Sequence, residues 1–115
     1  MNPLLIFAQD ETTREALKSA LSSYMPLIVT EDETQCLEAA GQKARLHKVF
    51  IGVCGMKDAA ELNIIEKIGA LRPGIIMIAV GDQHSEDTAL EAVERGAAGY
   101  MLLPLNDAEI QTAAR

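Results

Sequence analysis

The chain has 115 residues, of which 49% are apolar and 23% are charged, and its formal net charge is −7 at pH 7. This length and composition predict one globular domain with its own core, and no apolar run is long enough to cross a membrane. The basic residues are scattered singly, which argues against direct binding of a nucleic-acid backbone.

The two cysteines, Cys36 and Cys54, form no C-x-x-C motif, and only two histidines accompany them. This pattern predicts buried thiols in a reducing compartment, and it predicts neither a disulfide framework nor a zinc site. The opening residues have no secretory signal, so we expect a cytoplasmic location.

The first part of the chain predicts two strands, each followed by a helix. The apolar run Leu4–Ala8 predicts a buried strand, and Met25–Thr30 predicts a second one. Thr30 and Glu33 form a capping-box pattern that would start the second helix. Apolar side chains spaced three or four residues apart mark the inner faces of the two helices: Leu17, Ala20, Leu21 and Tyr24 on the first, and Leu37, Ala40 and Ala44 on the second.

A third strand, Val49–Val53, runs into glycine, cysteine and glycine before the next helix begins. Asp58 and Glu61 form another capping-box pattern there, and the "RPG" segment ends the helix. The apolar stripe of this helix comprises Leu62, Ile65, Ile68 and Leu71.

Two further units complete the pattern. Ile75–Val80 predicts the fourth strand, and a helix ending at Gly96 follows it. The fifth strand is Ala98–Leu103, and Asn106 with Glu109 is expected to cap a fifth helix. The apolar face of the fourth helix carries Ala89, Ala92 and Val93.

Five strand–helix units with strands apolar on both faces predict a doubly wound α/β sandwich, with a five-stranded parallel sheet covered by helices on both faces. The last helix carries no termination signal, so residues 1–115 are expected to be an N-terminal domain of a longer protein.

Ligands of such folds bind beyond the carboxyl ends of the strands, where this chain offers little chemistry. The residues at those positions are Ala8, Gln9, Asp10, Gly52, Cys54, Gly81, Asp82, Leu103 and Pro104. Phosphoryl transfer needs carboxylates for a metal ion and for the nucleophile, but the two aspartates are better explained as helix caps. Cys54 has only Lys57 as a basic neighbour, which does not favour a reactive thiol. We therefore predict no catalytic residue, no metal, no cofactor and no enzymatic activity.

Three segments carry a resemblance over essentially the whole chain: "LLIFAQDETTREALKSAL", "LRPGIIMIAVGD" and "ERGAAGYMLLPLNDAEI". They resemble the receiver domain of two-component response regulators, which implies the (βα)5 flavodoxin-like topology. The family's phosphoaccepting aspartate falls on Gly52, its Thr or Ser on Gly81, and its Lys on Leu103. Pro104 remains, and in the family the peptide bond before it is usually cis.

The acidic pair of the family falls on Ala8 and Gln9, with Asp10 one place later; a register shifted by one residue would make Asp10 a member of the pair. Such a shift would not restore Gly52, where an acyl phosphate has no carboxylate to form on. The resemblance therefore implies a degenerate, or pseudo-, receiver.

We expect this module to act by protein–protein contact or dimerisation and to regulate an attached output domain, with transcription control as the first expectation. The surface in question comprises the fourth helix, fifth strand and fifth helix, with Tyr100 as an aromatic anchor and Glu91, Glu94 and Arg95 as a charged rim. Tyr100 alternatively only packs at the sheet edge.

Two alternative functions stay open. The crevice could sense a small molecule or ion through Gln9, Asp10, Cys54 and Asp82. The domain could instead be a localisation adaptor on an ATPase.

Overall fold

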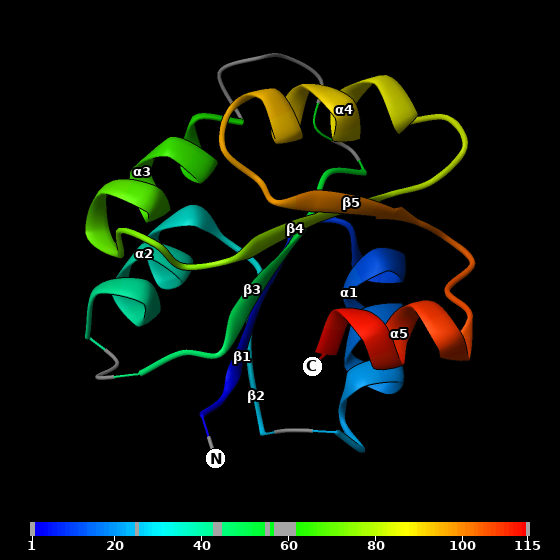
Figure 1. The fold of residues 1–115 in the computed structure, drawn as a ribbon, viewed down its shortest axis with the longest axis horizontal. Coiled ribbons are helices and arrows are strands. Elements are labelled where there is room, and N and C mark those ends of the chain that lie inside the picture. Colours follow the sequence, from blue (N-terminus) through cyan, green and yellow to red (C-terminus); the bar gives the residue numbers. More distant parts are fainter. Residues whose placement is uncertain (1, 25, 43–44, 55, 57–61, 115) are drawn as a thin grey trace.

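The computed structural model describes residues 2–24, 26–42, 45–54, 56 and 62–114 (Figure 1). Strands and helices alternate along the chain, as the sequence predicts. Their order is β1 (Leu4–Ala8), α1 (Glu11–Leu21), β2 (Leu27–Thr30), α2 (Glu33–Gln42), β3 (Lys48–Gly52), α3 (Asn63–Leu71), β4 (Met77–Gly81), α4 (Glu86–Glu94), β5 (Gly99–Leu102) and α5 (Asp107–Ala114).

The five strands form one parallel sheet in the order β2-β1-β3-β4-β5. Helices α1 and α5 cover one face, and α2, α3 and α4 cover the other (Figure 1). The predicted doubly wound sandwich is therefore confirmed. No helix in the described part of the chain is long and apolar enough to cross a bilayer.

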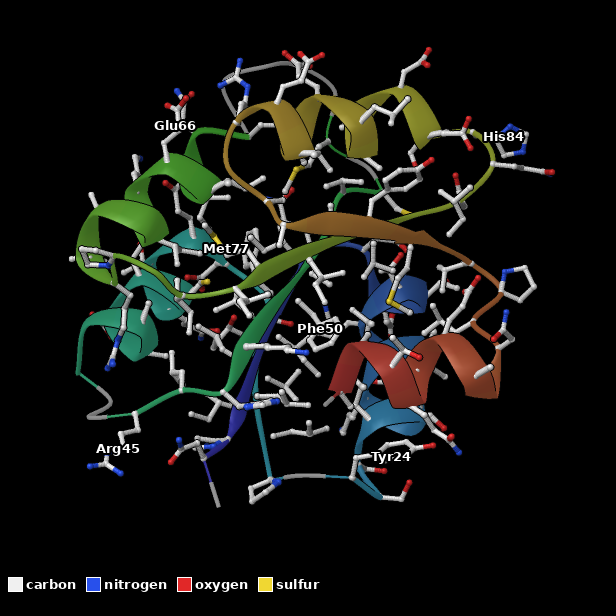
Figure 2. All side chains as sticks on the ribbon, in the orientation of Figure 1. Tyr24, Arg45, Phe50, Glu66, Met77 and His84 are labelled. Carbon is white, nitrogen blue, oxygen red and sulfur yellow. The ribbon has the colours of Figure 1, made fainter. Side chains whose placement is uncertain are left out.

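Alternation along the strands divides the core into two layers. Leu5 and Phe7 pack with the α2–α4 layer, whereas Leu4 and Ile6 pack with the layer of α1 and α5. Phe50 and Met77, from neighbouring strands, likewise belong to opposite layers (Figure 2). All five residues of β1, β3 and β4 are buried, as expected for central strands of a parallel sheet.

Some predicted details are wrong. Thr30 does not cap α2: its hydroxyl donates to the Ile6 carbonyl at 2.7 Å, and Asp32 accepts the Gln35 amide at 2.8 Å instead. Leu71, expected on the inner stripe of α3, is 50% exposed. The predicted cap at 58–61 and the expected inner residue Ala44 lie outside the described residues.

The C-terminal end of α4 and the start of α5 show how local chemistry sets helix boundaries. Gly96 follows α4 with φ of 130°, and the amide of the next residue, Ala97, donates to the Ala92 carbonyl at 3.1 Å. This is the Schellman arrangement that glycine permits. Asn106 caps α5 by accepting the Glu109 amide at 2.8 Å, as predicted.

We predict that Gly96→Ala destabilises the domain by about 1–2 kcal/mol, because an L side chain is strained at that φ. Gly99→Ala is the control, since a Cβ there meets nothing within 4 Å, and its effect should stay within about 0.5 kcal/mol. Urea unfolding of the three proteins measures the difference. Equal stabilities for the two variants would contradict the assigned role of Gly96.

Candidate functional site

The sheet brings the predicted crevice positions together at its carboxyl edge. Ala8 pairs with Gly52 in the register of β1 and β3. On the other side, the amide of Leu103 donates to the Gly81 carbonyl at 2.7 Å. The peptide bond between Leu103 and Pro104 is cis.

The position of Gly52 has no room for a side chain. A Cβ built there would lie 2.9 Å from the Cβ of Ala8 and 2.9 Å from the Cγ2 of Thr13. Real Cβ atoms essentially never approach another atom so closely. The end of β3 is therefore packed against β1 and the first turn of α1.

Gly81 is enclosed in the same way. A Cβ at this position would lie 2.8 Å from Ser85 Oγ and 3.2 Å from Val53 Cγ2. Ser85 Oγ also accepts the Asp82 amide at 2.8 Å. Neighbouring side chains therefore occupy the space beyond both glycines.

Asp10 is the N-cap of α1. One of its carboxylate oxygens accepts the Thr13 amide at 2.9 Å and the Thr13 hydroxyl at 2.8 Å. These bonds hold the fully buried Thr13 with its methyl group beside Gly52. The cap predicted for Asp10 is thus confirmed, and it positions the residue that fills the crevice.

Asp82 is not the N-cap of a helix, which corrects the expectation for this residue. The cap of α4 is Ser85, and Asp82 Oδ1 accepts the Ser85 hydroxyl at 3.0 Å and the His84 amide at 2.9 Å. The hydrogen bond from Ser85, followed by that from His84, lowers the pKa of the Asp82 carboxyl.

The positively charged side chain of Arg14 lies at the end of β1. Arg14 Nη1 donates to the Ala8 carbonyl at 3.0 Å and, at 3.5 Å, to the carbonyl of the exposed Gln9. Its Nη2 lies 3.5 Å from Glu31 Oε2. Arg14 thereby links β1 and α1 to the segment between β2 and α2.

Both cysteines are buried. Cys54 is 7% exposed, with its Sγ 3.6 Å from Ser85 Oγ, and its neighbour Lys57 lies outside the described residues. Burial raises the pKa of Cys36 to about 12, which keeps it a thiol. In the described part of the chain, no three His, Cys, Asp or Glu side chains are grouped to hold a metal ion.

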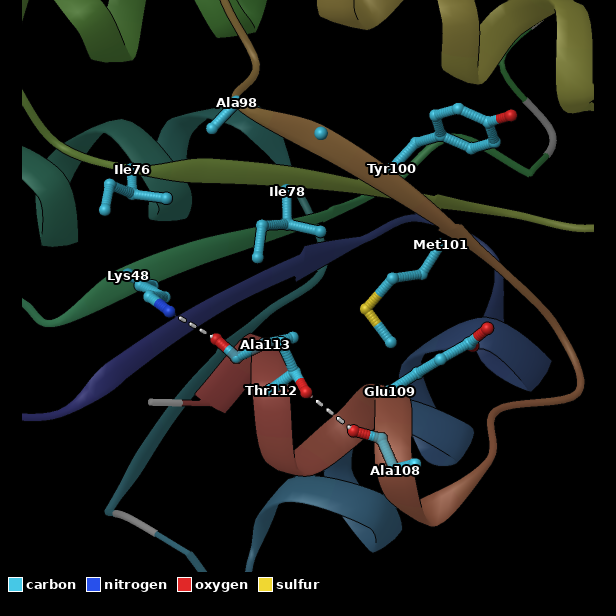
Figure 3. A pocket seen from close by; sticks show the side chains of 11 residues that line it. Lys48, Ile76, Ile78, Ala98, Tyr100, Met101, Ala108, Glu109, Thr112 and Ala113 are labelled. Carbon is cyan, nitrogen blue, oxygen red and sulfur yellow. Dashed lines mark hydrogen bonds between the residues drawn. The ribbon is translucent and has the colours of Figure 1, made fainter.

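Arg95, which was expected at the rim of the partner surface, forms contacts within the chain. Arg95 Nη1 donates to Asn63 Oδ1 at 2.8 Å, and its Nη2 donates to Glu91 Oε1 at 3.3 Å. Arg95 is thus engaged with α3 and α4 within the chain. Glu94 is exposed, and Tyr100 is 39% exposed, with its ring on the opposite side of β5 from Met101 (Figure 3).

Thr13, Arg14 and Ser85 were not identified as site residues from the sequence. Thr13 carried a signal, because it lies four residues before Leu17 and eight before Leu21, on the buried face of α1. Ser85, directly before the acidic first turn of α4, has an N-cap pattern, but this pattern does not show that its side chain lies beside Gly81. Nothing in the local sequence indicates where the side chain of Arg14 lies.

Comparisons with known proteins give structural matches alone. No family model and no curated protein matches the chain. A response regulator from Burkholderia pseudomallei, solved with a phosphorylated aspartate, calcium and citrate, has a TM-score of 0.79 at 21% identity, over 100% of this chain and 67% of that chain. One from Thermotoga maritima has a TM-score of 0.80 at 20% identity, over 98% of this chain and 94% of that chain.

The chain therefore has the fold of response-regulator receiver domains. A protein from Burkholderia thailandensis assigned to pilus assembly shares this receiver-like fold, with a TM-score of 0.79 at 23% identity over 98% of this chain and 94% of that chain. The same fold thus occurs in proteins of different roles, and the role of this chain has to be argued from its own residues.

We predict that Gly52→Ala destabilises the receiver fold by about 1–3 kcal/mol, because the added methyl group overpacks the crevice. Thr13→Ser removes the Cγ2 atom but keeps the hydroxyl that Asp10 binds. In the double variant, the loss should be smaller than the sum of the two single losses by about 0.5–1 kcal/mol. Denaturant unfolding of the four proteins measures this coupling.

Gly41→Ala in α2 serves as a control, since its Cβ would meet only Leu71 Cδ2, at 4.0 Å. This variant should be as stable as the parent or more so, because alanine is the better helix former. Strict additivity of the Gly52 and Thr13 changes would show that the two residues are not in contact.

We predict that the Asp82 carboxyl titrates below the ordinary aspartate value of about 3.9, and that Ser85→Ala raises its pKa towards that value. A carboxyl with a lowered folded-state pKa stabilises the fold above its unfolded pKa, and this contribution is lost as pH falls through the folded pKa. Carboxyl-detected NMR titration measures the shift, with Thr34→Ala as a distant control. An unchanged pKa in Ser85→Ala would exclude the hydroxyl as the main cause.

Proposed function

We propose that this domain is a receiver-like signalling module that is not phosphorylated at the family's usual position. We further propose that it acts by contact with another protein and regulates an attached output domain, in transcription control. The observation that carries the proposal is the packing around Gly52, where the nucleophilic carboxylate is missing and Ala8 and Thr13 fill its place. An acyl phosphate forms on a carboxylate, and the side chain of Gly52 is a hydrogen atom. This residue therefore cannot accept a phosphoryl group.

The same packing weighs against ion or small-molecule sensing in the crevice. The carboxylate of Asp10 is used within α1, and that of Asp82 is used in the turn that leads to α4. The space beyond Gly81 is taken by Ser85 and Val53. Contact at the surface is therefore favoured over binding in the crevice.

The surface that we propose for docking is formed by the outer side of α4 together with β5. Leu90 and Tyr100 are large side chains that stay 44% and 39% exposed there. β5 is also the last strand of the sheet, so its outer edge has no strand partner among the described residues. Exposed apolar groups next to an open edge are typical of a binding surface.

Charge favours a different protein over a second copy as the partner. The exposed side chains of α4 include Glu86, Asp87 and Glu94, whereas Arg95 is occupied within the chain. A two-fold dimer would bring these acidic groups together, which costs free energy. A partner with basic residues around an apolar pocket would complement the surface.

A localisation adaptor on an ATPase is the second candidate function. It is favoured by the structural likeness to the Burkholderia thailandensis protein assigned to pilus assembly. Both functions use docking without phosphorylation and differ in the attached or bound protein.

We predict that acetyl phosphate with Mg²⁺ leaves the 115-residue chain without a covalent phosphoryl group, as measured by intact-mass spectrometry.

In the natural protein that contains this domain, Leu90→Ser should reduce cross-linking to its partner and change the output activity. Leu71→Ser is the matched control, since Leu71 is a similarly exposed leucine at the end of α3. Partner binding should weaken as salt is raised.

Two results would overturn the proposal. One is an acid-stable, base-labile adduct on a carboxylate that alters association of the domain. The other is a protein whose partners and activity are unchanged after residues 1–115 are deleted.

A further inference from the structure

A pocket of about 520 Å³ lies between the sheet and α5, on the face opposite α4 (Figure 3). It is built at the amino ends of β3, β4 and β5, and so at the other edge of the sheet from the crevice. Its volume falls in the range of about 300–1,000 Å³ that small-molecule sites occupy. Its lining includes Lys48, Ile76, Ile78, Gly99, Met101 and Glu109.

Strand alternation and one missing side chain create the space. Ile78 pairs with Phe50 on one side and Gly99 on the other, so this row of the sheet ends in a glycine. A Cβ at Gly99 would meet nothing within 4 Å. The floor of the pocket is therefore open at β5 and apolar along β4.

Lys48 brings a positive charge to this apolar site. Its side chain is 9% exposed, although strands at the centre of a parallel sheet normally carry apolar residues. Its ammonium group donates to the Ala113 carbonyl at 2.6 Å, which uses one of three donors. Within the described ranges of the chain, no carboxylate forms an ion pair with it. Buried charges are usually paired, because an unpaired one is costly.

We propose that this pocket binds a small monocarboxylate with an apolar body. The carboxylate accepts a hydrogen bond from Lys48 Nζ, and the apolar body lies against Ile76, Ile78 and Met101. Glu109, exposed at the rim, would repel a second negative group, which disfavours dicarboxylates and phosphate esters. This proposal is independent of the docking function.

Octanoate is the test probe, with octanol and octylammonium as uncharged and oppositely charged controls of equal chain length. Titration into the ¹⁵N-labelled 115-residue chain should give saturable shifts of the Gly99, Tyr100 and Thr112 amide signals, with a Kd at or below about 1 mM. Octanol should bind at least about tenfold more weakly. Equal binding of octanoate and octanol, or octanoate shifts located elsewhere, would overturn the proposal.

Two variants test separately how the charge of Lys48 and the open space at Gly99 contribute to ligand binding. Lys48→Met should abolish the preference for octanoate over octanol, and Lys67→Met, which removes an exposed lysine of α3, should leave it unchanged. Gly99→Val keeps Lys48 but fills the floor, so it should lose binding of both ligands. If Lys48→Met does not fold, Gly99→Val decides: octanoate binding equal to that of the parent would show that the pocket is not the site.

Discussion

The close packing of β1 against β3 at Ala8 and Gly52, beside the methyl group of Thr13, restricts which side chains fit at the carboxyl end of β3. An ideal Cβ at Gly52 would lie 2.9 Å from each of these two neighbours, so any side chain at the end of β3 requires its neighbours to shift. Thr13 reaches this place because Asp10 caps α1 and binds both its amide and its hydroxyl. The carboxylate of Asp10 thus serves the start of α1, and this cap in turn fixes the methyl group that packs against Gly52.

The fold was predictable because it depends on repetition. Continuous apolar runs at Leu4–Ala8 and Ile75–Val80, separated by helical stripes and glycine-containing turns, allow few arrangements other than a parallel sheet between helices. The caps at Asp10 and Asn106 were predictable for a different reason, because a helix cap depends on only three or four consecutive residues. The cap at Thr30 failed because a tertiary contact, the carbonyl of Ile6 on the neighbouring strand, attracted the hydroxyl instead.

The position of the candidate site was predictable from the sequence, but the side chains that fill it were not. The topology places Ala8, Gly52 and Gly81 at one edge, but the sequence does not show that Thr13 and Ser85 close the space between them. The rotamers of long side chains decide which charged groups stay available at the surface. Arg95, a candidate for an intermolecular rim, turns back to Asn63, which is 32 residues earlier in the chain. Contacts of this kind depend on how whole helices pack, and no short motif carries them.

The two edges of the sheet offer opposite electrostatic settings, and this explains why the proposed ligand pocket lies where it does. Helices start at the carboxyl edge, where their amide groups favour anions, and here Asp10 already binds such a donor in α1. Helices end at the amino edge, where unpaired carbonyl groups favour cations. Lys48 Nζ and His47 Nε2 donate to the carbonyl groups of Ala113 and Ala114 in α5, at 2.6 and 2.9 Å. Lys48 therefore combines a hydrogen bond to α5 with a position in the lining of an apolar pocket, and this places the proposed anion site at the amino edge of the sheet.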